Sequence, residues 1–198
     1  MCCLSGKAAA RANRPELKKL HEDTLRAQKR LGLGDPILGD FPNIKFNNSP
    51  HLDMVQFIEQ ALLETRATTI FTHHPSDLNN DHLHTARACL TAARLHQRRP
   101  DAAAVQAVYY MEVLSATDWS FPGVATPFLA DTFVSIEEHL ALKIEALAEY
   151  TGVMRPPPHP RSEESIRALA TYRGGQAGVR YAESFQTAFR LLDIRNLP

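Results

Sequence analysis

The sequence predicts an α/β fold of three layers, in which a mostly parallel sheet carries helices on both faces. Short apolar and β-branched runs, of which Thr68–Phe71 and Val105–Met111 are the clearest, alternate with longer segments whose apolar residues recur at helical spacing. Strands that alternate with helices in this way are typical of parallel sheets. A chain of 198 residues can bury a sizeable core, so we expect a single domain over residues 1–198.

The first strand and the first helix are expected at the start of the chain. Met1–Gly6 has the composition of a strand end followed by a turn. Asn13 and Glu16 form a capping-box pattern, and Gly32 and Gly34 would end the helix that follows. The buried face of this helix would consist of residues at helical spacing: Leu17, Leu20, Thr24, Ala27 and Leu31.

The elements expected next are a short strand at Ile37–Leu38, a polar loop at Asp40–Asn48, a helix from Ser49-Pro50, a buried strand at Thr68–Phe71 and a helix at about Asp81–Gln97. Serine is a favourable N-cap and proline a favourable first helical residue, so Ser49 and Pro50 together mark a helix start. Val55, Ile58 and Leu62 would supply the buried stripe of that helix.

The elements expected in the second half are a strand at Val105–Met111, a surface segment at Leu114–Pro127, a strand at Thr132–Val134, a helix marked by Ile136, Leu140, Ile144 and Leu147, a proline connector at Arg155–Pro160, a helix at Ser162–Tyr172 and a last strand at Tyr181–Leu191. The surface segment contains Trp119 and two prolines and shows no period, which favours an irregular path.

Composition excludes several classes of function. The chain has 22 basic and 22 acidic residues, and this balance favours neither nucleic acid nor an anionic membrane as a partner. No apolar run is long enough to span a bilayer, and Met1–Gly6 is too short for the apolar part of a signal peptide. Cys2, Cys3 and Cys89 fit neither a zinc motif nor a disulfide framework, so we expect buried or bystander thiols and a cytoplasmic location.

The most informative stretch is Thr72–Ala86, which links the strand at Thr68–Phe71 to the following helix. It contains four of the nine histidines together with carboxylates and amides: His73, His74, His82, His84, Asp77, Asp81, Asn79 and Asn80. Open α/β sheets bind their ligands beyond the carboxyl ends of the strands. This loop is therefore the candidate site.

Imidazoles and carboxylates on one loop are what a divalent transition metal needs, since both are common zinc ligands. His82 and His84 point to nearly opposite sides of a helix, so His82 is the better candidate ligand and His84 is assigned to the helix surface. Asp81 would hold the imidazole in one tautomer. The residues also allow a plainer interpretation, in which Asp81 is an N-cap and His73 and His74 end a strand in solvent.

The segment HHPSDLNNDHLHTARA (residues 73–88) resembles the second motif of the LmbE-like, or PIG-L, family of zinc-dependent de-N-acetylases, in which Asp-His stands at the head of a helix. The similarity extends over nearly the whole chain, through CLSGKAAARANRPE, AQKRLG, LGDFPN and YRGGQAGVRYAESFQ. The resemblance implies a Rossmann-like sheet and one zinc ion. It also implies hydrolysis of the acetamide of an amino sugar or similar small conjugate, with release of acetate and a free amine.

The resemblance also implies roles for individual residues. His82 would be a zinc ligand and Asp81 its catalytic neighbour. Asn79 stands where relatives carry a histidine that serves the oxyanion. His74 and Asp77 would line the substrate cavity. The substrate-contacting arginine and acidic residue of the family correspond most nearly to His21 and Asn43.

The chain departs from the family pattern because it contains no His-Pro-Asp-Asp motif, which would supply two further zinc ligands and the general base. The resemblance therefore implies that the first strand of the family is missing here. We expect the chain alone to be an incomplete enzyme that binds zinc weakly, shows little deacetylase activity and tends to aggregate. The alternative is a catalytically inactive member of the family that serves in binding or assembly.

Overall fold

The computed structural model describes residues 2–7, 16–121, 123 and 125–193. These fall into two compact units. One comprises the chain up to Ile44 together with Phe133–Ser184, and the other comprises Lys45–Thr132 together with the chain from Phe185 onward. The prediction of a single domain stays a prediction.

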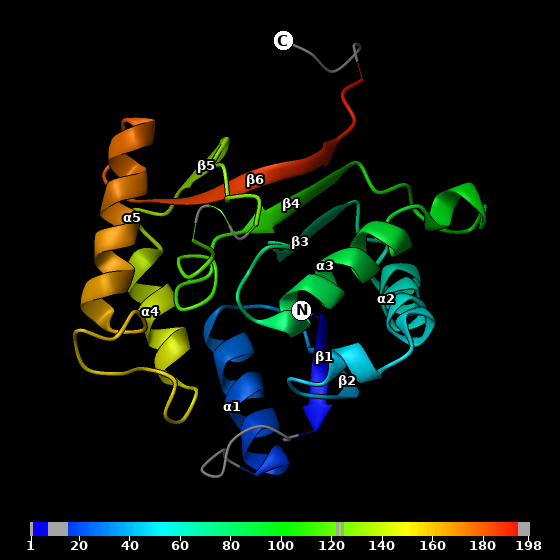
Figure 1. The fold of residues 1–198 in the computed structure, drawn as a ribbon, viewed down its shortest axis with the longest axis horizontal. Helices are drawn as coiled ribbons and strands as arrows, with labels where there is room; N and C mark the ends of the chain where they lie inside the picture. The colour runs from blue at the N-terminus through cyan, green and yellow to red at the C-terminus, as the bar shows by residue number, and fades with distance from the viewer. Residues whose placement is uncertain (1, 8–15, 122, 124, 194–198) are drawn as a thin grey trace. The chain divides into compact units, whose positions relative to one another are not determined.

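The strands form two sheets (Figure 1). β1 (Cys2–Lys7) pairs in parallel with β2 (Ile37–Pro42). The second sheet has the order β3-β4-β6-β5, with strands at Thr69–His73, Ala107–Met111, Ala182–Arg190 and Thr132–Ser135. β3 and β4 are parallel, whereas β4 and β6 are antiparallel. The α/β class is thus confirmed, but this sheet is mixed rather than mostly parallel. Helices on both faces of one sheet stay a prediction.

The helices lie close to their predicted positions: α1 at Leu17–Arg30, α2 at His51–Thr65, α3 at Asn80–Ala92, α4 at Leu140–Ala148 and α5 at Glu163–Ala177. Short 3₁₀ turns at Phe46–Asn48 and Leu95–Gln97 precede α2 and follow α3. Helix α2 begins one residue later than expected, because Pro50 rather than Ser49 occupies its N-cap position and no side chain caps it. The Asn13 part of the predicted capping box lies outside the described residues, and Glu16 makes no side-chain capping bond.

Helix α3 packs on β3 through a face of small residues, and α2 packs on α3 (Figure 1). Four side chains of this face of α3 are buried: Ala86, Ala88, Cys89 and Ala92. Burial raises the pKa of the Cys89 thiol to about 11, so the thiol is protonated at neutral pH, as expected of a bystander cysteine. On α2, the predicted stripe of Val55, Ile58 and Leu62 is buried as well.

Strand β3 is not the buried strand that its apolar composition predicts. Phe71 is 51% exposed, and Thr69 is exposed too. Among the described strands, β3 pairs only with β4 and so lies at the end of its sheet. The Phe71 ring still finds partners on one side, where it stacks on Tyr109 at 5.3 Å and lies 5.0 Å from Phe185 between ring centroids.

Helices α1 and α4 are joined by ionic contacts around a buried aspartate. The Asp23 side chain on α1 is fully buried, and its Oδ2 accepts a hydrogen bond of 2.8 Å from the backbone N–H of Thr151. Arg26 pairs with Asp23 and, at 3.1 Å, with Glu149. Arg30 contacts Glu149 at 2.8 Å. These contacts hold Glu149 and Thr151, which follow α4, against the middle of α1.

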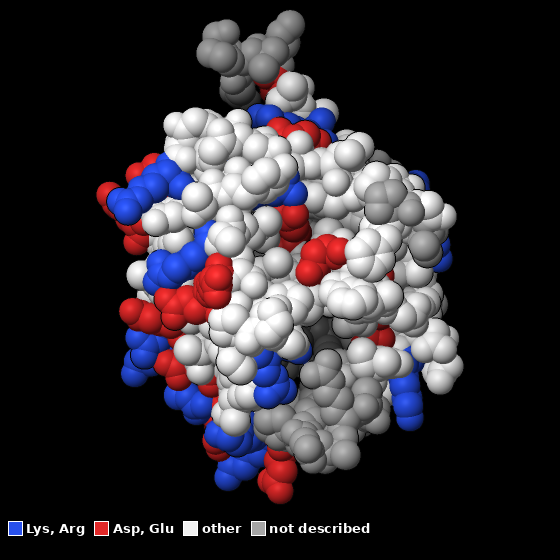
Figure 2. All heavy atoms as spheres, turned by 60° about the vertical axis from the view of Figure 1, so that its left-hand side comes forward, with Lys and Arg blue, Asp and Glu red and all other residues white. Residues whose placement is uncertain are grey.

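The surface carries both signs of charge. Figure 2 shows Lys and Arg side chains intermixed with Asp and Glu side chains over one face, in keeping with a formal net charge of zero. Among the helices that the structure describes, none combines the length and apolar character needed to span a bilayer.

Helix α5 passes through Gly174 and Gly175, and only the first of these glycines is needed for packing. A Cβ on Gly174 would lie 2.6 Å from the carbonyl oxygen of Val179 and 2.7 Å from that of Arg180, whereas a Cβ on Gly175 would meet nothing within 4 Å. We expect Gly174→Ala to lower the free energy of unfolding by about 2 kcal/mol through overpacking. The matched control Gly175→Ala should raise it by up to about 1 kcal/mol through helix propensity. Urea unfolding measures both, and equal effects of the two variants would contradict this assignment.

Candidate active site

The candidate site lies on the loop that connects β3 to α3. β3 ends at His73, and Asn79 caps the helix, its Oδ1 accepting a hydrogen bond of 3.0 Å from the backbone N–H of Asp81. Between them, the Asp77 N–H donates to the His74 carbonyl at 3.1 Å and forms a turn. The loop predicted from the sequence is therefore short and held by hydrogen bonds at both ends.

A histidine–carboxylate pair forms at the head of α3. Nδ1 of His82 lies 2.7 Å from Oδ2 of Asp77, whose side chain is fully buried. A carboxylate in this position holds a proton on Nδ1 and leaves the lone pair of the neutral ring on Nε2. Nε2 of His82 is thus the ring nitrogen whose lone pair is left available.

The ring of His73 covers one face of the His82 imidazole. Its ring stacks on the His82 ring with centroids 3.8 Å apart and planes 22° apart. Burial, assisted by the nearby His82, lowers the pKa of His73 to about 4, so the ring is neutral at neutral pH. Nδ1 of His73 and Oδ1 of Asp77 are both buried without a hydrogen-bond partner. The solvent-facing strand end that the plainer interpretation gave to His73 is therefore wrong.

Asp81 and Asn79 hold the helix start in place. Oδ1 of the buried Asp81 accepts a hydrogen bond of 3.1 Å from the backbone N–H of Phe46, in the 3₁₀ turn before α2. Asn79, rather than Asp81, is the N-cap. The contact with His82 that the sequence analysis gave to Asp81 is made by Asp77. A catalytic role for Asp81 and Asn79 stays a prediction.

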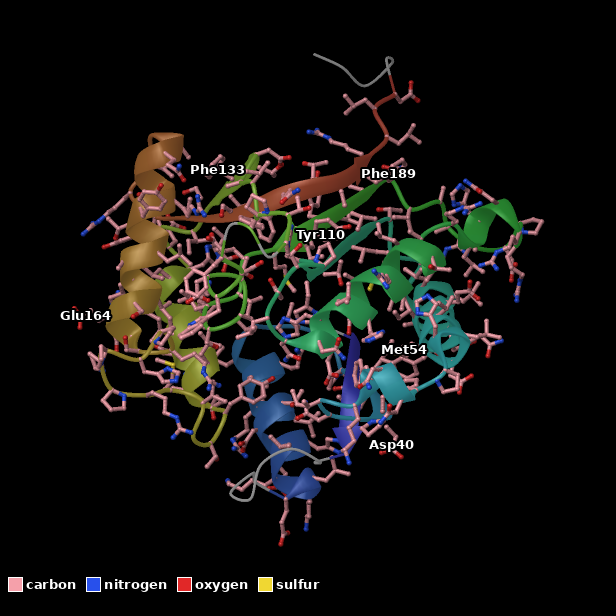
Figure 3. All side chains as sticks on the ribbon, viewed as in Figure 1. Asp40, Met54, Tyr110, Phe133, Glu164 and Phe189 are labelled. Carbon is pink, nitrogen blue, oxygen red and sulfur yellow. The ribbon has the colours of Figure 1, made fainter. Side chains whose placement is uncertain are left out.

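His74 is embedded among aromatic rings instead of ending a strand in solvent. It is 2% exposed, and its Nδ1 accepts a hydrogen bond of 3.2 Å from the Ser76 N–H. Tyr110 of β4 (Figure 3) and Phe128 both meet its ring edge-on, at centroid distances of 5.4 and 5.7 Å. Burial lowers the pKa of His74. A neutral, enclosed imidazole of this kind braces the loop, and its predicted contact with substrate stays a prediction.

The remaining candidates lie elsewhere. His21 on α1 and Asn43 after β2 belong to the other compact unit, so their part in a shared site stays a prediction. His84 is half-buried on α3. A cavity of about 480 Å³ is lined by α1, α4 and Glu183 of β6, and its lining, mostly apolar, includes none of the predicted site residues.

The donor atoms around His82 do not complete a zinc site by themselves. Within residues 2–7, 16–121, 123 and 125–193, no three His, Cys, Asp or Glu side chains are grouped so that they could hold a metal ion. His73 and His82 stack face to face, which keeps the in-plane lone pairs of the two rings in parallel planes instead of converging on one point. The zinc-ligand role predicted for His82 therefore stays a prediction.

The fold is similar to that of several solved proteins. The conserved protein TT1542 from Thermus thermophilus matches with a TM-score of 0.72 and 21% identity, over 94% of this chain and 80% of that protein. GalB, the 4-carboxy-2-hydroxymuconate hydratase from Pseudomonas putida, matches with a TM-score of 0.70 and 18% identity, over 95% and 79% of the two chains.

N,N'-diacetylchitobiose deacetylase from Pyrococcus horikoshii matches with a TM-score of 0.69 and 13% identity, over 94% of this chain and 70% of that protein. No protein-family model matches the sequence, and no curated protein matches it either. At these identities the structural matches establish a shared α/β fold.

Proposed function

We propose that this chain supplies a histidine, His82, of the active site of a hydrolase. This hydrolase removes the N-acetyl group from an amino sugar or a similar small conjugate. The observation that carries the proposal is the Asp77–His82 pair, built where the chain leaves β3, in a fold shared with a chitobiose deacetylase. Deacetylation uses water to cleave an amide. GalB, which has a similar fold, is named as a hydratase, an enzyme that adds water to its substrate. Both reactions call for a group that positions and activates water.

The proposed roles follow from the hydrogen bonds of each side chain. Asp77 fixes the tautomer of His82, so Nε2 faces the reacting groups with its lone pair. His73, held neutral and stacked on His82, keeps water from one side of the imidazole. Because Oδ1 of Asn79 is used by the cap, its Nδ2–H is the donor for the carbonyl oxygen of the substrate.

The other predicted groups complete the proposal. His82 is the residue of this chain that we propose as a zinc ligand. Asp81 holds the first turn of α3, and His74, Asn43 and His21 are the proposed contacts with substrate. In the reaction the water oxygen bonds to the acetyl carbon, the C–N bond breaks, and a proton passes to the leaving amine.

The test is acetate release by the zinc-loaded protein from a panel of N-acetylglucosamine conjugates that includes N,N'-diacetylchitobiose. We expect release of acetate and amine in equal amounts. No acetate from any member of the panel would overturn the proposal.

A second candidate is a protein of this fold that binds N-acetylated ligands without hydrolysing them. The incomplete ligand set around His82, within the described part of the chain, is the observation that favours it. Saturable binding of the panel compounds without acetate release, in a protein shown to contain zinc, would support this second candidate.

We expect Asp77→Asn to lower kcat for acetate release by about 10- to 100-fold, because an amide does not hold the proton on Nδ1 as a carboxylate does. The change is nearly isosteric, so the fold should be retained. Steady-state kinetics measure the effect, and Asp53→Asn, at an exposed position in the first turn of α2, is the matched control. An unchanged kcat in Asp77→Asn would show that the 2.7 Å contact has no role in the reaction.

A further inference from the structure

The segment that follows β4 lies beside the loop that carries Asp77. β3 and β4 are parallel, with His73 opposite Met111, so the two strands end at the same edge of the sheet. Beyond this edge, the Leu78 N–H donates a hydrogen bond of 3.1 Å to the carbonyl of Ala116. Residues 112–121 and the candidate site therefore share one edge of the unit.

This segment is held by hydrogen bonds around Thr117. Thr117 is buried, its Oγ1 accepts a hydrogen bond of 2.8 Å from the Val113 N–H, and its own N–H donates to the Val113 carbonyl at 2.8 Å. Further along, the ring of Phe128 meets that of His74, on the site loop. Thr117 and Phe128 thus tie the segment after β4 to the loop that carries Asp77.

Two exposed aromatic rings follow Thr117 in this segment. Trp119 is 51% exposed and Phe121 is 56% exposed, and their rings meet at 62° with centroids 5.6 Å apart. Leu78 and Leu129 are exposed as well. Oγ of Ser120, between the two aromatic residues, is buried and has no hydrogen-bond partner among the described residues. Exposed aromatic residues that lie together are typical of a binding surface.

We propose that Trp119, flanked by Phe121, is the platform on which the pyranose ring of the N-acetylated sugar stacks, an assignment that rests on the proposed function. A pyranose presents C–H groups on its faces and hydroxyls on its rim. The indole face attracts the C–H groups through dispersion and weak C–H contacts. The exposed Asp118, next to Trp119, matches the polar rim of a sugar better than it matches an acyl chain.

The first test uses fluorescence, because Trp119 is the one tryptophan of the 198-residue chain. We expect N,N'-diacetylchitobiose to shift its emission with a saturable dependence on concentration. Trp119→Phe serves as the blank. N-acetylglycine, which has the amide but no sugar ring, should cause no shift. A shift with octyl-chain detergents and none with the sugar would overturn the proposal in favour of an acyl ligand.

The second test uses kinetics in the zinc-loaded, full-length protein. We expect Trp119→Ala to raise KM for the sugar substrate about tenfold with little change in kcat, because the platform binds substrate and transition state alike. Trp119→Phe should restore part of the affinity. The matched control is Tyr172→Ala, which removes another exposed aromatic ring, on α5. Equal KM values for wild type and Trp119→Ala would overturn the proposal.

The two tests separate this proposal from the function on which it rests. A saturable emission shift without any acetate release supports the platform and contradicts the deacetylase. Acetate release from the sugar without an emission shift contradicts the platform and supports the deacetylase.

Discussion

Replacing His82 by alanine should lower kcat/KM for acetate release by about a thousandfold in the zinc-loaded, full-length protein. The change removes the Nε2 lone pair and leaves the buried carboxylate of Asp77 without its partner. Zinc bound per chain should fall as well, since His82 is the proposed ligand. Coupled assays of acetate and elemental analysis measure these two effects.

The matched control is His84→Ala, two residues along the same helix, where the histidine is half-buried and has no role in the proposed reaction. Its kcat/KM should stay within about twofold of the wild-type value. Circular dichroism must show that His82→Ala remains folded, because His82 also stacks on His73. Unchanged zinc content in folded His82→Ala would mean that the ligand assignment is wrong.

Asp23→Ala should lower the free energy of unfolding by about 2 to 3 kcal/mol, which corresponds to a fall in Tm of roughly 5 to 10 °C. The fully buried carboxylate accepts a hydrogen bond from the Thr151 N–H and pairs with Arg26. Its removal leaves the buried N–H unsatisfied. Scanning calorimetry measures the change. Lys19→Ala, which removes an exposed charge 3.7 Å from Asp23, is the control and should shift Tm much less.

The stabilisation by Asp23 should also depend on pH. Burial alone would raise the pKa of this carboxyl, but the hydrogen bonds from Thr151 and Arg26 outweigh burial and hold the pKa below its ordinary value. The charged form therefore stabilises the fold above the unfolded-state pKa of about 4, and this stabilisation is lost as pH falls through the folded-state pKa. The difference in unfolding free energy between wild type and Asp23→Asn should shrink below about pH 4. A difference that stays constant down to about pH 2 would contradict this role.

Local signals in the sequence were sufficient to place most elements. Periodic apolar residues located α2, and Ser162, which accepts a hydrogen bond from the Ser165 N–H, gave the start of α5 correctly. Local signals do not show whether a strand lies in the middle or at the edge of its sheet. Thr68–Phe71 has the composition of a buried strand, yet pairing on one side leaves Phe71 half exposed, and only the tertiary arrangement decides this.

The candidate site, too, was predicted only in part from the sequence. Sequence spacing distinguished His82 from His84, because the two point to opposite sides of a helix. It could not tell which carboxylate meets the imidazole, since Asp81 is adjacent in sequence whereas Asp77 reaches His82 through the turn before the helix. Nor did it assign a function to Trp119, because an irregular segment has no period to show which side chains are anchored and which project.

The small residues on the buried face of α3 set the distance between Asp77 and His82, the two groups that we propose take part in the reaction. His82 moves with the helix, whereas Asp77 belongs to the loop tied to the end of β3, so the 2.7 Å between them depends on how closely helix and strand approach. Methyl and thiol side chains allow that close approach, and a leucine at Ala86 or Ala88 would push the helix axis outward. A displacement of about 1 Å is enough to lower a reaction rate about a hundredfold. The spacing of the proposed catalytic pair is thus adjustable from residues outside the candidate site.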